Sequence, residues 1–382
     1  MRKIRRALLF GVVLILCAGC SSGKGEDLNR EGLRLFREGQ FSEAVAVFEE
    51  AIVEDNREPL YYDNMGMAYL EMKDYASAES AFQMALNLSE KDKYAYRGLG
   101  ISYLRQGRYE EAVAAFFTAI EMAGTKVGQA EYDTLLYRAE AELGMGDYAG
   151  AVATYGILVE AEPKNADYRY LRGRAFLMQG SLESALAEFN TGVTHAPKDY
   201  AYYMNIYKLL DERGYAEEGT NYLKSALTIG GDSDEIHRYR GEIQYLLENY
   251  SSAAAEFQAV KAPLDSRCLI FLGNSYSRMG EAQKAYQVYT EALDRAPEKA
   301  PLYGELALLK MEEGDYRTAL DFLGQGIALN DASVQKDLKY AEAVCYEYLH
   351  EYRTALEKFE AWQAEFGESP EATHEIEFLR TR

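Results

Sequence analysis

Apolar residues between Lys93 and Lys126 fall into two blocks, each with the spacing of one face of an α-helix. The first block contains Tyr96, Leu99, Gly100 and Tyr103, and the second contains Ala112, Phe116, Ala119 and Ile120. A polar turn at Gln106-Gly107-Arg108 separates them. This pattern predicts two helices joined by a tight turn, that is, a helical hairpin.

Residue size within this stretch predicts how the hairpin packs. Gly100 and Ala112 are small enough to let the two helices approach closely, and Phe116 fills the space that they leave open. A single hairpin would still expose an apolar face to water. The stretch therefore predicts further copies of itself stacked on both sides.

Such copies recur along the chain at nearly constant intervals. Small residues equivalent to Ala112, the predicted packing positions, are Ala44, Ala78, Ala112, Ala151, Ala185, Gly219, Ala253, Ala285, Ala319 and Ala355. Six of the nine intervals between them are 34 residues long. A large residue follows each of them four positions later, at Phe48, Phe82, Phe116, Tyr155, Phe189, Leu223, Phe257, Tyr289, Leu323 and Phe359. The register predicts ten hairpins of the same kind.

With this repeat the chain resembles the tetratricopeptide repeat family, whose unit is 34 residues long. The third repeat matches the family pattern at Leu99, Gly100, Tyr103, Gly107, Tyr109, Ala112, Phe116 and Ala119. The resemblance covers residues 25–369. It implies an all-α fold, a right-handed superhelical solenoid of about ten tetratricopeptide-type helical hairpins. Three residues depart from the pattern: Gly219 replaces the packing alanine, and Arg172 and Glu342 replace a leucine.

The amino terminus reads as an export signal. Arg2, Lys3, Arg5 and Arg6 precede an apolar run from Ala7 to Ala18, which is too short to cross a bilayer comfortably. Ala18 and Gly19 before Cys20 resemble a bacterial lipobox, although Cys17 stands where leucine is usual. The resemblance implies a lipid on Cys20. Cleavage by an ordinary signal peptidase, which would give a secreted protein, is the alternative.

These features divide the chain into four parts. We expect a lipoprotein signal peptide over residues 1–19, a lipidated Cys20 with a flexible tether over residues 20–27, and the solenoid over residues 28–369. Residues 370–382 place Ile376, Phe378 and Leu379 among charged residues, as in a C-terminal capping helix that covers the last apolar face. The expected location is outside the cytoplasmic membrane, either on its outer face or on an outer membrane.

The family resemblance also implies a binding surface. First helices of such hairpins line the concave side of the superhelix, with positions 2, 5, 6, 9, 12 and 13 of each repeat facing inward. Arginine, lysine and tyrosine at these positions form the predicted partner-binding groove: Arg97, Arg105, Tyr137, Tyr170, Arg174, Lys208, Arg238, Tyr239, Tyr245, Arg278 and Tyr340. Both tyrosine and arginine are common anchors of protein partners. The alternative interpretation is an ordinary solvated helix face.

Charge and composition restrict the partners. The chain has a formal charge of −21, and removal of the predicted signal would leave 37 basic and 62 acidic residues. Such a surface repels nucleic acid, although acidity also serves simply to keep a long array soluble. The four histidines are scattered singly, and Cys268 and Cys345 lie two hairpins apart, too far for a disulfide. The sequence therefore predicts no enzyme, no metal, no cofactor and two buried thiols.

We therefore predict a membrane-anchored, extracytoplasmic scaffold that binds protein or peptide partners of the cell envelope. A second hypothesis is a protein that binds glycan or cell-wall fragments against the tyrosines of the groove. Both hypotheses use the same surface. Saturable binding of peptidoglycan fragments that Tyr170→Ala and Tyr239→Ala abolish would favour the glycan hypothesis.

Overall fold

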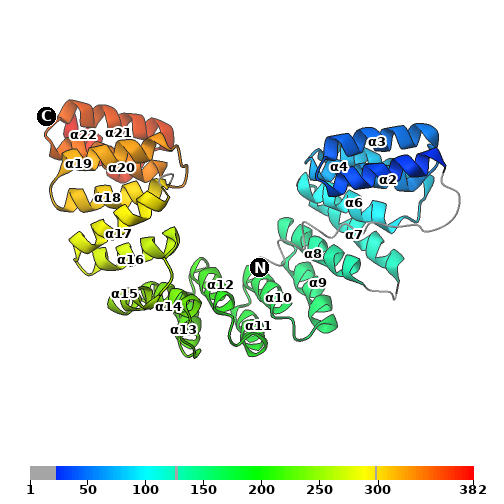
Figure 1. Ribbon diagram of the computed structural model, residues 1–382, viewed down its shortest axis with the longest axis horizontal. Coiled ribbons are helices and arrows are strands. Elements are labelled where there is room, and N and C mark those ends of the chain that lie inside the picture. The colour runs from blue at the N-terminus through cyan, green and yellow to red at the C-terminus, as the bar shows by residue number, and fades with distance from the viewer. Residues whose placement is uncertain (1–22, 125–127, 297–298) are drawn as a thin grey trace. The chain divides into compact units, whose positions relative to one another are not determined.

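The computed structural model describes residues 23–124, 128–296 and 299–382, and these residues form 21 α-helices and no strand. The helices pair into ten hairpins followed by one further helix (Figure 1). Hairpins 1 to 5 are α2 (Lys24–Arg37) with α3 (Phe41–Glu54), α4 (Pro59–Glu71) with α5 (Tyr75–Leu88), α6 (Lys93–Arg105) with α7 (Tyr109–Ala123), α8 (Gln129–Gly144) with α9 (Tyr148–Ala161), and α10 (Ala166–Met178) with α11 (Leu182–His195). Hairpins 6 to 10 are α12 (Tyr200–Asp211) with α13 (Ala216–Ala226), α14 (Asp234–Leu246) with α15 (Tyr250–Ala259), α16 (Ser266–Arg278) with α17 (Ala282–Arg295), α18 (Ala300–Glu312) with α19 (Tyr316–Ala328), and α20 (Gln335–Tyr348) with α21 (Tyr352–Phe366). The last helix is α22 (Pro370–Leu379).

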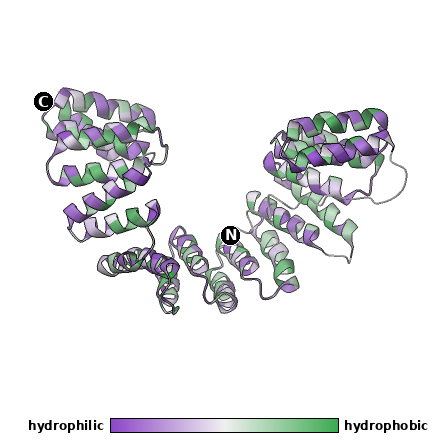
Figure 2. Cartoon of the chain, in the orientation of Figure 1, coloured by the Kyte–Doolittle hydropathy of each residue, from purple (hydrophilic) through white to green (hydrophobic). Residues whose placement is uncertain are grey.

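The chain forms two units. The first contains α2 to α11 and ends at Tyr202, with residues 212–214 added, and the second contains most of α12 and all of α13 to α22. Successive hairpins pack on one another from hairpin 1 to hairpin 5 and from hairpin 7 to hairpin 10. Hydrophobic and hydrophilic residues occur within the same helices (Figure 2). The predicted all-α stack of tetratricopeptide-type hairpins is confirmed within each unit. The right-handed sense of a superhelix stays a prediction.

The turn inside each hairpin uses the same backbone geometry. The residue five positions before each packing position has a positive φ, as at Gly107, where φ is 75°. Glycine occupies seven of these ten sites, and the other three are Lys73, Glu248 and His350. A left-handed residue lets the chain reverse between two helices, and glycine adopts this conformation without a steric penalty. The turns therefore follow the register that the packing positions predicted.

Inside a hairpin such as hairpin 3, an aromatic ring of the second helix packs against a glycine of the first helix. Phe116 of α7 is fully buried, and a Cβ added to Gly100 of α6 would lie 2.5 Å from its ring. The same arrangement joins Gly66 to Phe82 and Gly241 to Phe257. All ten packing positions are buried as well. Close approach of the two helices therefore depends on a missing side chain on the first helix and a large one on the second.

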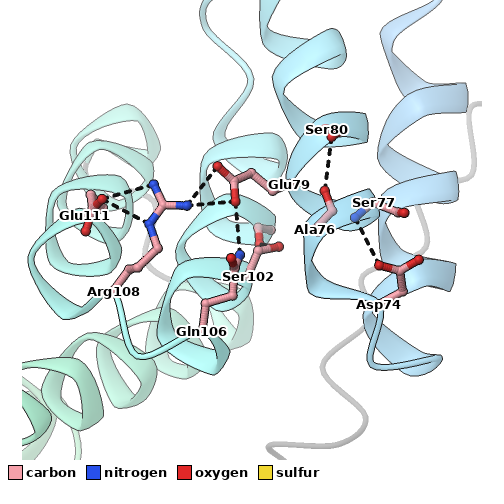
Figure 3. A network of polar contacts seen from close by, with 10 residues as sticks. Asp74, Ala76, Ser77, Glu79, Ser80, Ser102, Gln106, Arg108 and Glu111 are labelled. Atoms are coloured by element: carbon pink, nitrogen blue, oxygen red, sulfur yellow. Dashed lines mark hydrogen bonds and ion pairs between the residues drawn. The ribbon is translucent and has the colours of Figure 1, made fainter.

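Polar contacts join one hairpin to the next at their turns. Arg108, in the turn of hairpin 3, donates from Nη1 to both carboxylate oxygens of Glu79 on α5, at 3.0 and 2.9 Å (Figure 3). Its Nε donates to Glu111 at 3.0 Å, and its guanidinium lies 4.2 Å from the ring centroid of Tyr103. Gln106 donates to Glu79 as well, at 3.0 Å. One carboxylate thus fixes the turn of hairpin 3 on the second helix of hairpin 2.

The departures from the repeat pattern have local explanations. Tyr207 occupies the site on α12 where other first helices carry glycine or alanine, and a Cβ on Gly219 would lie 3.2 Å from its ring. In this hairpin the large side chain lies on the first helix, and the glycine lies on the second. Arg172 forms an ion pair with Glu188 of its own hairpin. Likewise Glu342 pairs with Lys358 at 2.8 Å, so both leucine sites hold a cross-helix ion pair.

Helix α22 covers the end of hairpin 10. Its residues Ile376 and Leu379 are buried and join one apolar cluster with Ala355 and Phe359 of α21. Ser369 caps the helix by accepting a hydrogen bond from the backbone N–H of Ala372 at 3.1 Å. The C-terminal capping helix of the predicted fold is therefore present. Phe378 stays partly exposed.

One boundary needs correction. The predicted flexible tether extended to residue 27, but α2 begins at Lys24, because Gly25 packs against Tyr61 and Lys24 forms an ion pair with Glu54. The predicted signal peptide, the predicted lipobox and Cys20 lie outside the described residues. Cys268 and Cys345 are both buried and free, as predicted. None of the helices in the described part of the chain has both the length and the hydrophobicity that a membrane span requires.

Candidate functional site

The candidate site is the first-helix face, which we define as the side chains at positions 2, 5, 6, 9, 12 and 13 of each repeat, where the repeats begin at Gly25, Pro59, Lys93, Tyr132, Ala166, Tyr200, Asp234, Ser266, Ala300 and Lys336. Unit 1 contributes this face from α2, α4, α6, α8 and α10, and unit 2 contributes it from α12, α14, α16, α18 and α20. Asp or Asn caps the start of several of these helices, for example Asp92, which accepts hydrogen bonds from the backbone N–H groups of Tyr94 and Ala95. The face therefore stands on rigid, capped helices.

In hairpins 3 and 4, two predicted groove residues are packing residues as well. Arg97 is 8% exposed, and its guanidinium carbon lies 5.7 Å from the ring centroid of Tyr137 on the next first helix. Tyr137 is also buried, and its ring stacks on Phe116 with 6.0 Å between centroids. Arg105 is more exposed and donates to Glu140 at 3.3 Å. These contacts hold α6 against α8. That Arg97, Arg105 and Tyr137 bind a partner stays a prediction.

The fifth hairpin shows the same combination. Tyr170 is buried, with its ring centroid 5.9 Å from that of Phe189 on α11. Arg174, one turn later on α10, has no ion pair among the described residues, and its charge lowers the pKa of Tyr155 and Tyr170 against the stronger effect of burial, which raises both. Arg174 is therefore a cation beside two covered rings. Because Tyr137 and Tyr170 are buried, their rings are not open to a sugar, and this counts against the glycan hypothesis at these two positions.

In unit 2 the predicted basic residues differ in how firmly they are held. Arg238 of α14 donates to the carbonyl of Pro263 at 3.0 Å and lies 3.6 Å from the carboxylate of Asp265. Lys208 and Arg278 are exposed and form no ion pair within the described chain. Arg238 is therefore committed to its neighbours, whereas Lys208 and Arg278 are available to a partner.

The remaining predicted tyrosines are partly buried between helices. Tyr245 has Tyr250 and Phe271 at 5.6 and 5.1 Å between ring centroids, both edge to face. Tyr340 packs in the same way between Phe359 and Trp362, at 5.3 and 5.4 Å. Tyr239 is also partly buried. Much of the tyrosine content of this chain is thus explained by packing between first and second helices.

Several polar side chains of the first-helix face make contacts that sequence analysis did not predict. Glu242 is 5% exposed, and Arg267 from the next hairpin donates to it at 2.7 Å. Burial raises the pKa of Glu242, and the charges of Arg267 and Lys208 offset part of that effect. The buried Tyr289 donates to Oδ1 of Asn274 at 2.5 Å, and Oε2 of Glu305 lies 3.4 Å from the same hydroxyl. The repeat register places Glu242, Asn274 and Glu305 on this face, but only their burial and contacts distinguish them from solvated side chains.

Asp63, on α4 of hairpin 2, was missed as well. It is 6% exposed, and its Oδ1 has no hydrogen-bond partner within the described residues. Burial, with a further contribution from the charge of Asp92, raises the pKa of Asp63 to about 8. The carboxyl is therefore mostly protonated in the folded protein at neutral pH.

Asp63→Asn is expected to stabilise the protein at alkaline pH. The pKa of Asp63 is about 8 in the folded state and about 3.9 in the unfolded state, so the folded protein holds this proton more tightly. The stability that this gives is fully present below about pH 3.9 and is lost as the pH rises to about 8. Near pH 3.9 the variant and wild type should have the same free energy of unfolding. Above about pH 8 the variant should have the higher free energy of unfolding. Urea unfolding at several pH values measures this, with Glu50→Gln as the exposed control. Equal pH dependence of wild type and Asp63→Asn would contradict it.

Comparison with known families agrees with this architecture. Models of the tetratricopeptide repeat match residues 58–125, 137–200 and 269–301. The matched segments, which together span less than half of the chain, are similar to tetratricopeptide repeats. The matched segments contain all or part of hairpins 2, 3, 4, 5 and 8, whose packing positions and rings are described above.

Relatives and solved structures add similar repeats. Human tetratricopeptide repeat protein 13 is 24% identical over 171 residues, which is 43% of this chain and 20% of that protein. Human DnaJ homolog subfamily C member 7 is 33% identical over 88 residues, 23% of this chain and 17% of that protein. The chain thus spans about a fifth of the length of these curated relatives.

Two solved structures show the level of structural likeness. A chain of the APC/C hetero-tetramer Cut9-Hcn1 covers 94% of this chain and 96% of its own length, at 14% identity and a TM-score of 0.45. MamA from Desulfovibrio magneticus RS-1 covers 47% and 99%, at 18% identity and a TM-score of 0.42. With TM-scores below 0.5, the repeat assignment rests on the family matches and on the packing of the hairpins.

The chemistry of the face is that of non-covalent recognition. Within the described residues, no three His, Cys, Asp or Glu side chains are placed to hold a metal ion. The groups on the face are arginine and lysine donors, asparagine amides, carboxylate acceptors and the half-exposed Leu308. These groups suit non-covalent contacts with a protein or peptide.

Proposed function

We propose that this protein is an exported, lipid-anchored scaffold that binds protein partners of the cell envelope through its first-helix face. One observation carries the binding part of the proposal. Tetratricopeptide hairpins present first-helix side chains in a fixed register, and ion pairs such as Arg105 with Glu140 hold some of them while Arg278 and Lys208 stay exposed and unpaired within the described chain. Such a preorganised surface loses little conformational entropy when a partner binds.

The anchoring part of the proposal comes from the sequence before the first hairpin. A basic start, a short apolar run and Gly19-Cys20 support export and lipid attachment at Cys20. Two or more acyl chains would hold the array firmly at a membrane, and this raises the local concentration of the array near membrane-bound partners.

Cys20→Ala is expected to abolish labelling of the protein by a palmitate analogue in cells. Cys20 supplies the only thiol at the predicted cleavage site, so without it no thioether to lipid can form. In-gel fluorescence of the purified protein measures the label. Cys17→Ala is the matched control, because it changes the neighbouring cysteine and should keep the label. Equal labelling of wild type and Cys20→Ala would remove the anchor from the proposal.

Partner binding is tested by site-specific photocrosslinking. A benzoylphenylalanine at Arg278, which is exposed on the first-helix face, should form crosslinked adducts with a protein partner in intact cells. The same group at Thr290, which is exposed on the second helix of the same hairpin, is the control. Adducts from Arg278 that are absent from Thr290 support the proposal. Adducts of equal yield from both positions contradict a role specific to the first-helix face.

A further inference from the structure

The structure leaves little chain between the proposed lipid anchor and the first hairpin. Helix α2 begins at Lys24, four residues after Cys20, and four extended residues span at most about 14 Å. Lys24 forms an ion pair with Glu54 at the end of α3, and a Cβ on Gly25 would lie 3.4 Å from the carbonyl oxygen of Ala51. A lipid on Cys20 would therefore hold the end of hairpin 1 where α2 begins and α3 ends close to a bilayer surface.

The most exposed large apolar side chain among the described residues lies at this end of hairpin 1. Val53, next to Glu54 on α3, is 83% exposed. Leu88 at the end of α5 and Met122 near the end of α7 are 40% and 37% exposed, and each stands within one position of the equivalent site in its own repeat. Because hairpins 1, 2 and 3 pack on one another in the same register, the three side chains lie along one edge of unit 1, which we call the anchor-side edge.

The other hairpins of unit 1 do not continue this row. The two equivalent positions, nine and ten residues after the packing position, hold Glu160 and Ala161 in hairpin 4 and Thr194 and His195 in hairpin 5, all exposed. In unit 2 these positions contain one exposed large apolar residue, Leu329 of hairpin 9. Exposed apolar side chains thus gather at the three hairpins nearest the anchor, where a lipid surface is within reach.

The charges of the anchor-side edge indicate the kind of lipid. The loop of residues 55–58 holds two acidic side chains and one basic, and the loop of residues 89–93 holds two of each. Anionic headgroups are attracted by clusters of basic residues, and this edge has no such excess. The contact then depends on apolar burial, at about 25 cal/mol per Å², which is weak for three side chains in solution. An anchor makes a weak contact sufficient, because it raises the local concentration of lipid at the edge.

We propose that Val53, Leu88 and Met122 insert into the interface of a zwitterionic bilayer when Cys20 carries its lipid. The anchor-side edge of unit 1 then lies against the membrane, and the turns inside the hairpins, such as the turn at Gly107, lie on the opposite edge. The first-helix face of unit 1 stands between the two edges and stays open to partners beside the membrane. This inference rests on the proposed function, because it requires the anchor and adds how the anchor orients unit 1.

Tryptophan fluorescence on vesicles tests this orientation. The lipidated protein, purified from cells, is incorporated into phosphatidylcholine vesicles whose acyl chains are either plain or brominated, since bromine quenches tryptophan on contact. The new tryptophan of Val53→Trp should lose most of its fluorescence on brominated vesicles, after subtraction of the wild-type signal from the buried Trp362. Met72→Trp is the matched control. Met72 is 41% exposed at the turn of hairpin 2, on the opposite edge of unit 1, and its tryptophan should stay unquenched.

The outcomes separate the lipid contact from the anchor. Quenching of Val53→Trp together with an unquenched Met72→Trp supports the contact. Equal quenching of the two variants, or quenching that requires anionic phosphatidylglycerol in the vesicles, would overturn it. The absence of quenching in both variants, while the protein still floats with the vesicles, would also overturn the contact and would leave the anchor in place. A protein that does not float with vesicles would refute the anchor, and with it that part of the proposed function.

Discussion

Replacing Phe116 with alanine is expected to lower the free energy of unfolding by about 3 to 5 kcal/mol. The ring is fully buried in hairpin 3, where it lies against Gly100 and stacks on Tyr137 of the next hairpin. Truncation leaves a cavity that glycine cannot fill, because Gly100 has no side chain to move into it. The loss therefore includes both the transfer of the ring to water and the contacts around the cavity.

Phe117→Ala is the matched control for this change. The two residues are adjacent on α7, but Phe117 is 46% exposed and its one ring contact of note is Arg138, 5.5 Å away. Its truncation should cost under about 1 kcal/mol. Urea unfolding followed by circular dichroism gives both values. Hydrogen exchange should place the effect of Phe116→Ala in α6 to α8, since each hairpin contacts only its neighbours. Losses of similar size for both variants would contradict the packing described here.

Gly241→Ala is expected to destabilise unit 2 by about 1 to 3 kcal/mol, although alanine is the better helix former. A Cβ at this position on α14 would lie 2.7 Å from the ring of Phe257, which is almost completely buried. The ring cannot withdraw, because its other side is packed as well. Overpacking should therefore outweigh the gain in helix propensity, which amounts to about 1 kcal/mol.

Gly324→Ala is the control with the opposite expected sign. This glycine lies in α19, is exposed, and has no atom within 4 Å of the place where a Cβ would be. Alanine should stabilise the helix there by up to about 1 kcal/mol. The midpoints of thermal unfolding measure both effects: a lower midpoint is expected for Gly241→Ala and a higher one for Gly324→Ala. A stabilised Gly241→Ala would show that the first helix of hairpin 7 does not depend on close approach to the ring.

The register of the fold was readable from residue size alone. Ala112 and its equivalents recur with a large residue four positions later, and the positive φ at Gly107 and at the nine equivalent turns follows the same spacing. Repeats permit this because each hairpin contacts only its neighbours, so local pattern and tertiary packing coincide. The extent of α2 was misjudged at Lys24, because a Ser-Gly-Lys run looks like a linker until its packing partner Tyr61 is known.

The candidate site was less readable. Position within the repeat assigns Arg97, Tyr137 and Arg278 to the first-helix face, but it does not distinguish the buried Arg97 from the exposed Arg278. That difference depends on which side chain the neighbouring hairpin supplies. The hydrogen bond from the Tyr289 hydroxyl to Asn274 was hidden for the same reason, since the sequence register marks Tyr289 only as another packing ring.

The sequence by itself determined the number of hairpins, their turns and their small-against-large packing, because these depend on residues close together in the chain or one repeat apart. Only the tertiary structure decided which polar side chains of the first-helix face are neutralised, buried or exposed. A hydrogen bond or an ion pair is set by distances of a few ångströms between helices. Those distances follow from how the rings and glycines of neighbouring hairpins fit together, which no single repeat specifies.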